Sequence, residues 1–371
     1  MKSLFMILFL LSCANPFLKD NEPRKSKLSS EEQLQKKLDL YLSQSSQGLD
    51  EFGFYDHIGD SLLFTCLLNA SGGSTDISQA VLPSGRPLRH PNISPEISRT
   101  SFSKDMMVGY LVCMWVMSEQ KSLPLIESLI KHGRSNNWNL CGDLGAYEDK
   151  AILDGHNKLS HRIDMLSRCV MSPALIATIY DLAVKVGYNC DVSCHTARTI
   201  FIQTPTNSKG FARHLNFLHQ SLRGLIEGSI NDNQVSIFRN GVENQPNNAL
   251  YQAIYHTYSN RDQSKALSLL LDENKFPSGA IPDNNNYCTH YLFQRDERRT
   301  KVLTADAGGC IQYKDAGIIS DVKECGLSPD SQVTRYMYNP DWLPCDGGSS
   351  KAGIDFMYAA TWVLGKLKGI K

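Results

Sequence analysis

Aspartates placed just ahead of apolar runs are the residues of this sequence best suited to chemistry. Asp60 stands in YDHIGDSLLF and Asp105 in SFSKDMMVGY. Two carboxyl groups that face each other across a cleft can cleave a glycosidic bond, one as the acid and the other as base or nucleophile. An aspartate at a helix start can equally serve as a cap that accepts backbone N–H groups and suits the helix dipole. We take Asp60 and Asp105 as the candidate catalytic pair, with the capping role as the alternative.

Further polar and aromatic side chains could contact a sugar near such a pair. His57 could act as a general base, because histidine titrates near neutral pH, or could simply donate a hydrogen bond. Tyrosine and tryptophan rings offer flat apolar faces to sugar rings. The candidate substrate-binding residues are His57, Arg89, His90, Tyr291, Asp296 and Trp342.

We predict neither a metal nor a cofactor. The polar loop 136–161 is either solvated surface, a cleft wall or a cation site. Cys190, Cys194 and His195 form CxxxCH, one residue longer than the haem-attachment motif CxxCH, so a local disulfide or a loop turn is the better interpretation. The sequence lacks GxGxxG, phosphate-loop, HExxH and GxSxG motifs, which argues against nucleotide enzymes, zinc proteases and common serine hydrolases.

Helices must position these residues. Ser29 with Glu32 is typical of a capping box, and Ser172-Pro173 and Gly187 mark the start and end of a later helix. The run MMVGYLVCMWVM is apolar almost all round, which predicts a helix buried on most sides. Short extended pieces are possible at 199–203 and 235–239. The first predicted helix begins at Ser29. The other helices are predicted over 58–70, 103–117, 122–133, 172–186, 211–227, 248–258, 262–271 and 355–367.

This pattern predicts an all-α chain, with an α/α toroid-like multi-helix domain and long disulfide-containing loops. If these helices all start at the same end of the domain, the aspartates at their starts, Asp355 included, lie close together at that end. The stretches GRPLRHPNIS, SFSKDMM and WLPCDGGSSKAGIDFMYAA loosely resemble cleft-lining segments of bacterial (α/α) toroid enzymes that act on polysaccharides. The resemblance implies an architecture and a substrate class, and it identifies no catalytic residue.

The amino terminus indicates export. Lys2 precedes the short apolar run 4–11, as in a secretory signal. Leu10-Leu11-Ser12-Cys13 resembles the lipobox of bacterial lipoproteins, which implies cleavage after Ser12, lipidation of Cys13 and, with Ala14 following, the outer membrane. An ordinary signal peptide cut elsewhere is the alternative. We expect a signal peptide at 1–12, a lipidated tether at 13–30 and one helical domain at 31–371.

Ten cysteines remain once Cys13 is set aside from the eleven in the chain. An even number in an exported protein indicates disulfides. Cys288, Cys310, Cys325 and Cys345 lie in polar, glycine-bearing sequence that suits them, whereas Cys66 and Cys113 lie in apolar helical runs, where free thiols are equally expected.

Composition limits the function classes. The net charge is zero, which gives no electrostatic basis for binding nucleic acid. The sequence therefore leads to two hypotheses: a membrane-anchored envelope enzyme that cleaves a polysaccharide or peptidoglycan fragment, and a non-catalytic surface lipoprotein that binds an envelope or host partner. We expect the membrane as a partner through the lipid anchor. Neither the bond cleaved nor the oligomeric state can be inferred.

Overall fold

Helices make up most of the described part of the chain. The computed structural model describes residues 28–45, 61–88, 102–140, 170–199, 210–244, 246–273, 276, 278, 291–292, 302–304, 311–312 and 354–367. These residues contain eleven α-helices, so the predicted all-α class is confirmed.

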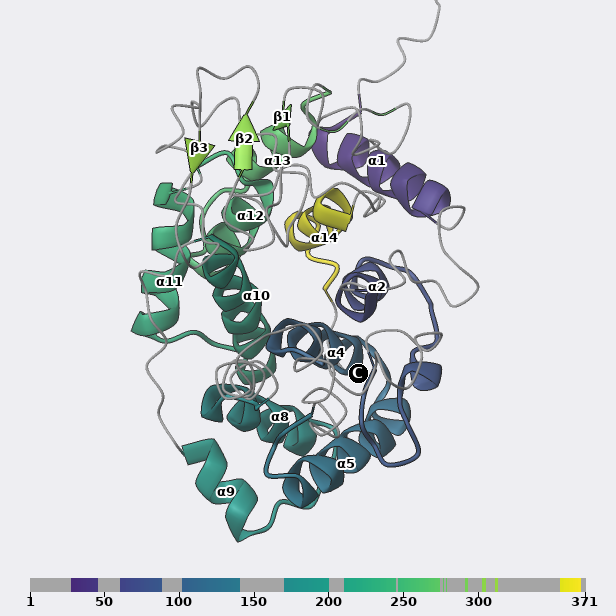
Figure 1. Cartoon of the computed structure of the whole chain (residues 1–371). Helices are drawn as coiled ribbons and strands as arrows, with labels where there is room; N and C mark the ends of the chain where they lie inside the picture. The colour runs from purple at the N-terminus through teal and green to yellow at the C-terminus, as the bar shows by residue number, and fades with distance from the viewer. Residues whose placement is uncertain are drawn as a thin grey trace, which may run out of the picture.

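The helices follow one another as a long series (Figure 1). The first half of the chain contains α1 (Ser30–Ser45), α2 (Ser61–Ala70), the 3-10 helix η1 (Ser78–Ala80), α4 (Lys104–Val116), α5 (Glu119–Ser135), α8 (Pro173–Lys185) and α9 (Val192–Thr199). The second half contains α10 (Gly210–Glu227), α11 (Asp232–Asn244), α12 (Ala249–Tyr258), α13 (Ser264–Leu270) and α14 (Ile354–Val363).

Local start and stop signals act as predicted at two helices. Before α1, the Ser29 N–H donates to Glu32 Oε2 at 2.7 Å, and the Glu32 N–H donates to Ser29 Oγ at 3.2 Å, which is a reciprocal capping box. At α8, Ser172 Oγ accepts the Leu175 N–H at 3.3 Å. Gly187 follows the helix with φ +91°, a left-handed conformation that favours glycine.

Two predictions about elements are wrong, and one helix was missed. The helix expected at 122–133 begins earlier, at Glu119 after the cap residue Ser118, so Pro124 lies inside α5 rather than in its first turn. The extended piece expected at 235–239 lies inside α11. Its buried residues, Gln234, Ile237, Phe238 and Val242, follow helical spacing and outweigh the short alternation of Val235 and Ile237. Helix α9 was not predicted at all.

A small antiparallel sheet follows α13 in sequence. Its strands are β1 (Tyr291–Leu292), β2 (Val302–Thr304) and β3 (Ile311–Gln312), in the order β1-β2-β3. Tyr291 is opposite Thr304, and Val302 is opposite Gln312. Strands of two or three residues are too short for a period-two pattern, which explains why the sequence did not predict them.

The carboxyl-terminal helix packs against both ends of the helical series. Helix α14 contacts α1, α2, α12 and α13, so helices that are distant in sequence lie side by side (Figure 1). Helices α2, α4, α10, α11, α12 and α14 contact one another in a closed circuit, while α5 and α8 pack against α4. Helix α9 contacts α8 at the edge of the molecule.

Helix α4 lies in the core, as its composition predicted. All residues from Asp105 to Trp115 are buried. The largest fully buried side chains are aromatic and come from several helices, including Tyr110 of α4, Phe64 of α2 and Phe217 of α10. Within the described ranges, every helix is too short or too polar to span a bilayer.

Candidate functional site

Asp105, half of the predicted catalytic pair, lies in the first turn of α4 and is only 5% exposed. It also has an interaction partner within the protein. A general acid or base must come within hydrogen-bond reach of its substrate. A carboxyl group with so little exposure cannot reach a sugar polymer in this conformation, and its position favours the structural role that the sequence left open.

The first turns of α2 and α4 lie at the same end of the molecule. A Cβ added at Gly109 would lie 2.5 Å from the Leu63 Cα, and one turn further along both helices Cys66 and Cys113 form a disulfide. From the first contact to the second, the residue number rises on both helices. The two helices therefore run in the same general direction. Asp60 precedes Ser61 in sequence and lies outside the described residues.

Helix α14, which carries Asp355 in its first turn, starts beside α1. The ring of Phe356, in the same turn, lies 4.3 Å from that of Tyr41. The neighbouring Leu42 side chain lies 3.3 Å from where a Cβ on Gly72 would stand, just beyond the end of α2. That Asp355 lies at the same end as the starts of α2 and α4 stays a prediction.

Of the other predicted site residues, only Tyr291 lies in a described element, β1. The residues outside the described part are Cys13, His57, Asp60, Arg89, His90, Asp296 and Trp342. Cys288, Cys310, Cys325 and Cys345 and most of the polar loop 136–161 also lie outside it. Among the residues that the structure does describe, no three histidine, cysteine, aspartate or glutamate side chains are grouped as metal ligands would be.

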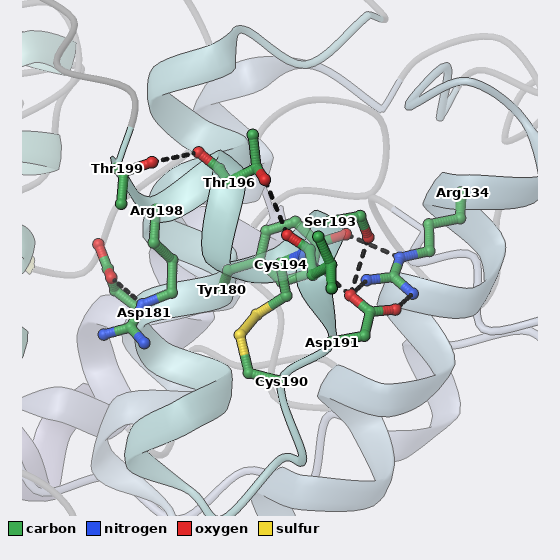
Figure 2. Close-up of a disulfide and its surroundings, with 11 residues drawn as sticks. Arg134, Tyr180, Asp181, Cys190, Asp191, Ser193, Cys194, Thr196, Arg198 and Thr199 are labelled. Atoms are coloured by element: carbon green, nitrogen blue, oxygen red, sulfur yellow. Dashed lines mark hydrogen bonds and ion pairs between the residues drawn. A yellow bond between two sulfur atoms is a disulfide. The ribbon is translucent and has the colours of Figure 1, made fainter.

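A polar cluster lies beside the disulfide between Cys190 and Cys194 (Figure 2). Of the two interpretations left open for Cys190 and Cys194, the local disulfide is the one that forms. Between them in sequence, Asp191 accepts two hydrogen bonds from Arg134, Nη1 to Oδ2 at 2.6 Å and Nη2 to Oδ1 at 2.8 Å. Asp191 Oδ1 also accepts the Cys194 N–H at 2.9 Å and the Ser193 hydroxyl at 2.8 Å. The cluster thus fixes the start of α9.

Arg134 connects this cluster to the core. Its Nε donates to the Tyr180 hydroxyl at 2.8 Å, and its guanidinium lies 5.4 Å from the centre of the Tyr180 ring. The Trp138 ring packs edge-on against Tyr180 at 5.6 Å. The hydrogen bonds with Asp191 raise the pKa of Arg134, and the same bonds, chiefly those from Arg134, hold the pKa of Asp191 well below its usual range. Both groups are therefore charged at any physiological pH.

Helix α10 carries two buried histidines. His219 Nε2 lies 2.9 Å from the Thr178 hydroxyl, which itself donates to the Ala174 carbonyl and so accepts from the ring N–H. His214 Nδ1 lies 3.2 Å from the Tyr251 hydroxyl. Burial lowers the pKa of each histidine to about 3, so both rings are neutral at pH 7.

Comparison with protein-family models, with curated proteins and with solved structures found no match to this chain.

Proposed function

We propose that this chain is a lipid-anchored protein of the bacterial cell envelope that binds an envelope or host partner and does not cleave it. Cys13 carries the lipid and becomes the mature amino terminus, and Ala14 directs the protein to the outer membrane. The segment 13–30 tethers the helical domain to that membrane. The Leu10-Leu11-Ser12-Cys13 pattern supports the anchor.

The oxidised cysteines support export. Cys66 pairs with Cys113 and Cys190 pairs with Cys194. Disulfides persist beyond the inner membrane and are rare in the cytosol of most organisms, where thiol systems keep cysteines reduced. The first pair joins α2 to α4 inside the core, where both cysteines have no exposed surface. A protein that incorporates a disulfide in its core is suited to an oxidising compartment.

The burial of Asp105 is the observation that favours binding over catalysis. Paired-acid cleavage needs two carboxyl groups open to the same groove. With 5% exposure, Asp105 does not offer one.

Glycoside cleavage is the second candidate. The shared end of α2 and α4 favours it, because that end brings the start of one helix next to the start of the other. The closed circuit of helix contacts supports the finer proposal of a toroid-like arrangement.

The test uses the mature chain with Cys13→Ser, which keeps the protein in solution without its lipid. Release of reducing ends is measured from peptidoglycan and from a set of polysaccharides, alongside saturable binding to outer-membrane vesicles and isolated cell walls. Asp60→Asn and Asp105→Asn are compared with Asp39→Asn, which changes an exposed aspartate of α1. If the protein binds its partner without cleaving it, every variant should show saturable binding and none should release reducing ends. Cleavage that both site variants lose and Asp39→Asn keeps would establish the enzyme, and lack of saturable binding would also count against the proposal.

A further inference from the structure

We propose that Cys190–Cys194 is a redox-active disulfide, open to exchange with a dithiol reductant, and that its reduction releases the first turn of α9 from the connection before it. The proposal depends on three features of the described structure: access to one sulfur, a favourable site for the leaving thiolate, and a short helix with a single buried residue.

Access distinguishes this disulfide from the one in the core. Thiol–disulfide exchange begins when a thiolate reaches a disulfide sulfur, so at least one sulfur must be accessible. Cys66 and Cys113 have no exposed surface, and neither has Cys194. Cys190 is partly exposed and lies in the connection between α8 and α9. We therefore expect a reductant to attack at Cys190 rather than at Cys194.

The other sulfur is well placed to leave. Cys194 lies in the first turn of α9, where the positive end of the helix dipole favours a thiolate. The adjacent Asp191 carboxylate would oppose a second negative charge, but its charge is balanced by the two hydrogen bonds from Arg134. Figure 2 shows this arrangement, with the guanidinium facing Asp191 beside the disulfide.

The exchange proceeds in two steps. A thiolate of the dithiol attacks Cys190 Sγ, the bond between the two protein sulfurs breaks, and Cys194 leaves as a thiolate that takes up a proton. The second thiolate of the reductant then attacks the mixed disulfide and displaces Cys190 as a thiolate, which also takes up a proton. The reductant becomes a disulfide, and the cysteine pair has gained two electrons and two protons.

Helix α9 is short and mostly exposed. Of its eight residues only Cys194 is buried, and Val192 is 81% exposed. A helix of this length is unstable alone in water. The disulfide joins the connection before α9 to the first turn of the helix, where the Cys194 N–H also donates to Asp191. Reduction removes the covalent link that closes this turn, while the Arg134–Asp191 pair and the pair of Arg198 Nε with Asp181 Oδ1 at 2.7 Å remain.

The first experiment compares the two disulfides in one sample of the folded, full-length mature chain. Dithiothreitol is added for increasing times, free thiols are alkylated, and trypsin then separates the sites. Cys190 and Cys194 both fall in peptide 186–198, Cys66 falls in 38–89 and Cys113 falls in 105–121, with no other cysteine in any of them. We expect peptide 186–198 to be alkylated at least about tenfold faster than the other two. Equal rates, or faster reduction of the core pair, would overturn the proposal.

The second experiment tests the release of the first turn of α9. Amide hydrogen exchange is followed in the oxidised chain, in the selectively reduced chain and in the double variant Cys190→Ser/Cys194→Ser. Loss of protection in α9 in both altered forms, with α4 and α8 unchanged, supports the proposal. Unchanged protection of α9 would show that the disulfide does not hold the helix, and loss of protection throughout would show general destabilisation, so either result contradicts it.

Discussion

Gly109 allows α2 and α4 to approach closely because it has no side chain. An alanine Cβ at this position would lie 2.5 Å from the Leu63 Cα and 2.9 Å from its Cδ1. The first of these atoms belongs to the backbone, so a rotamer change cannot relieve the contact.

Gly109→Ala should therefore destabilise the fold, by about 1–3 kcal/mol on the scale of overpacked cores. Without the close contact, alanine in place of glycine would stabilise a helix interior by roughly 0.5–1 kcal/mol. The sign of the change in the free energy of unfolding therefore decides whether the close contact is present. Urea unfolding of the oxidised chain measures it. Glu127→Ala, on the exposed side of α5, serves as the control and should change stability by less than about 0.5 kcal/mol. A more stable Gly109→Ala protein would refute the predicted close packing.

The two buried histidines predict how stability depends on pH. Their pKa of about 3 in the folded protein lies below the ordinary value of 6.5 that they regain on unfolding. Between these values the unfolded chain binds more protons, so stability is at its maximum above pH 6.5 and falls as the pH drops toward 3. Each histidine contributes a slope of up to about 1.4 kcal/mol per pH unit.

Unfolding free energies between pH 7 and about 5.5 test this, above the range in which Asp191 and Glu273, with their lowered pKa values, add to the slope. His214→Phe keeps an aromatic ring beside Tyr251 and should flatten the curve. His195→Gln, at an exposed position of α9, should leave it as it is. A wild-type stability that stays constant across this range would contradict the burial of the two neutral rings.

How well single residues could be predicted depended on how far apart their partners lie in sequence. Ser29 and Glu32 are three positions apart, and their reciprocal hydrogen bonds follow from a local pattern. Cys190 and Cys194 are four apart, and their pairing was one of two local interpretations. Arg134 and Asp191 are 57 positions apart, and only the folded arrangement of α5, α8 and α9 brings them together.

Among the elements, α1 is fixed to the rest of the molecule by a buried lysine. The Lys37 side chain is 3% exposed, and its Nζ lies 3.0 Å from Glu273 Oε1, whose side chain is 60% exposed. The ammonium also lies 5.6 Å from the centre of the Phe356 ring in α14. Glu273 accepts the N–H and hydroxyl of Ser278 as well, and these bonds together with Lys37 lower its pKa to about 2.

The unequal burial of this pair makes two substitutions differ. Glu273→Gln leaves the buried ammonium without its carboxylate and should cost roughly 1–3 kcal/mol. Lys37→Met leaves a carboxylate that water can solvate, keeps the apolar stem and should cost less. Urea unfolding of both variants at pH 7 compares them. Equal losses, or a greater loss for Lys37→Met, would contradict the burial of this lysine.

Elements with strong local signals were predicted and the others were not. Helix α4 is buried on nearly all sides, as its uniform apolar composition indicated. Helix α9 escaped prediction because VSCHTART has no apolar stripe, and its position depends on the disulfide and on Asp191. The start of α5 was misplaced because Pro124 is typical of a first turn, whereas here it lies inside the helix.

For the whole molecule, the all-α class followed from composition and helix signals, but the direction of each helix did not. Whether acids at helix starts meet depends on those directions, and a sequence read one helix at a time does not contain them. The structure brings the starts of α2 and α4 together. Pairing of Cys66 with Cys113 was likewise left open, because buried thiols and a buried disulfide have the same sequence pattern.

Export and lipidation form the central claim for the whole molecule, and the mass of the mature amino terminus tests them most directly. The chain is expressed in a bacterial host, the membranes are isolated, and the first tryptic peptide is measured by mass spectrometry in wild type and in Cys13→Ser. We predict a peptide of residues 13–19 in the membrane fraction that carries the mass of a diacylglyceryl group and is missing from Cys13→Ser. A soluble chain that retains residues 1–12, or an unmodified Cys13, would contradict the claim.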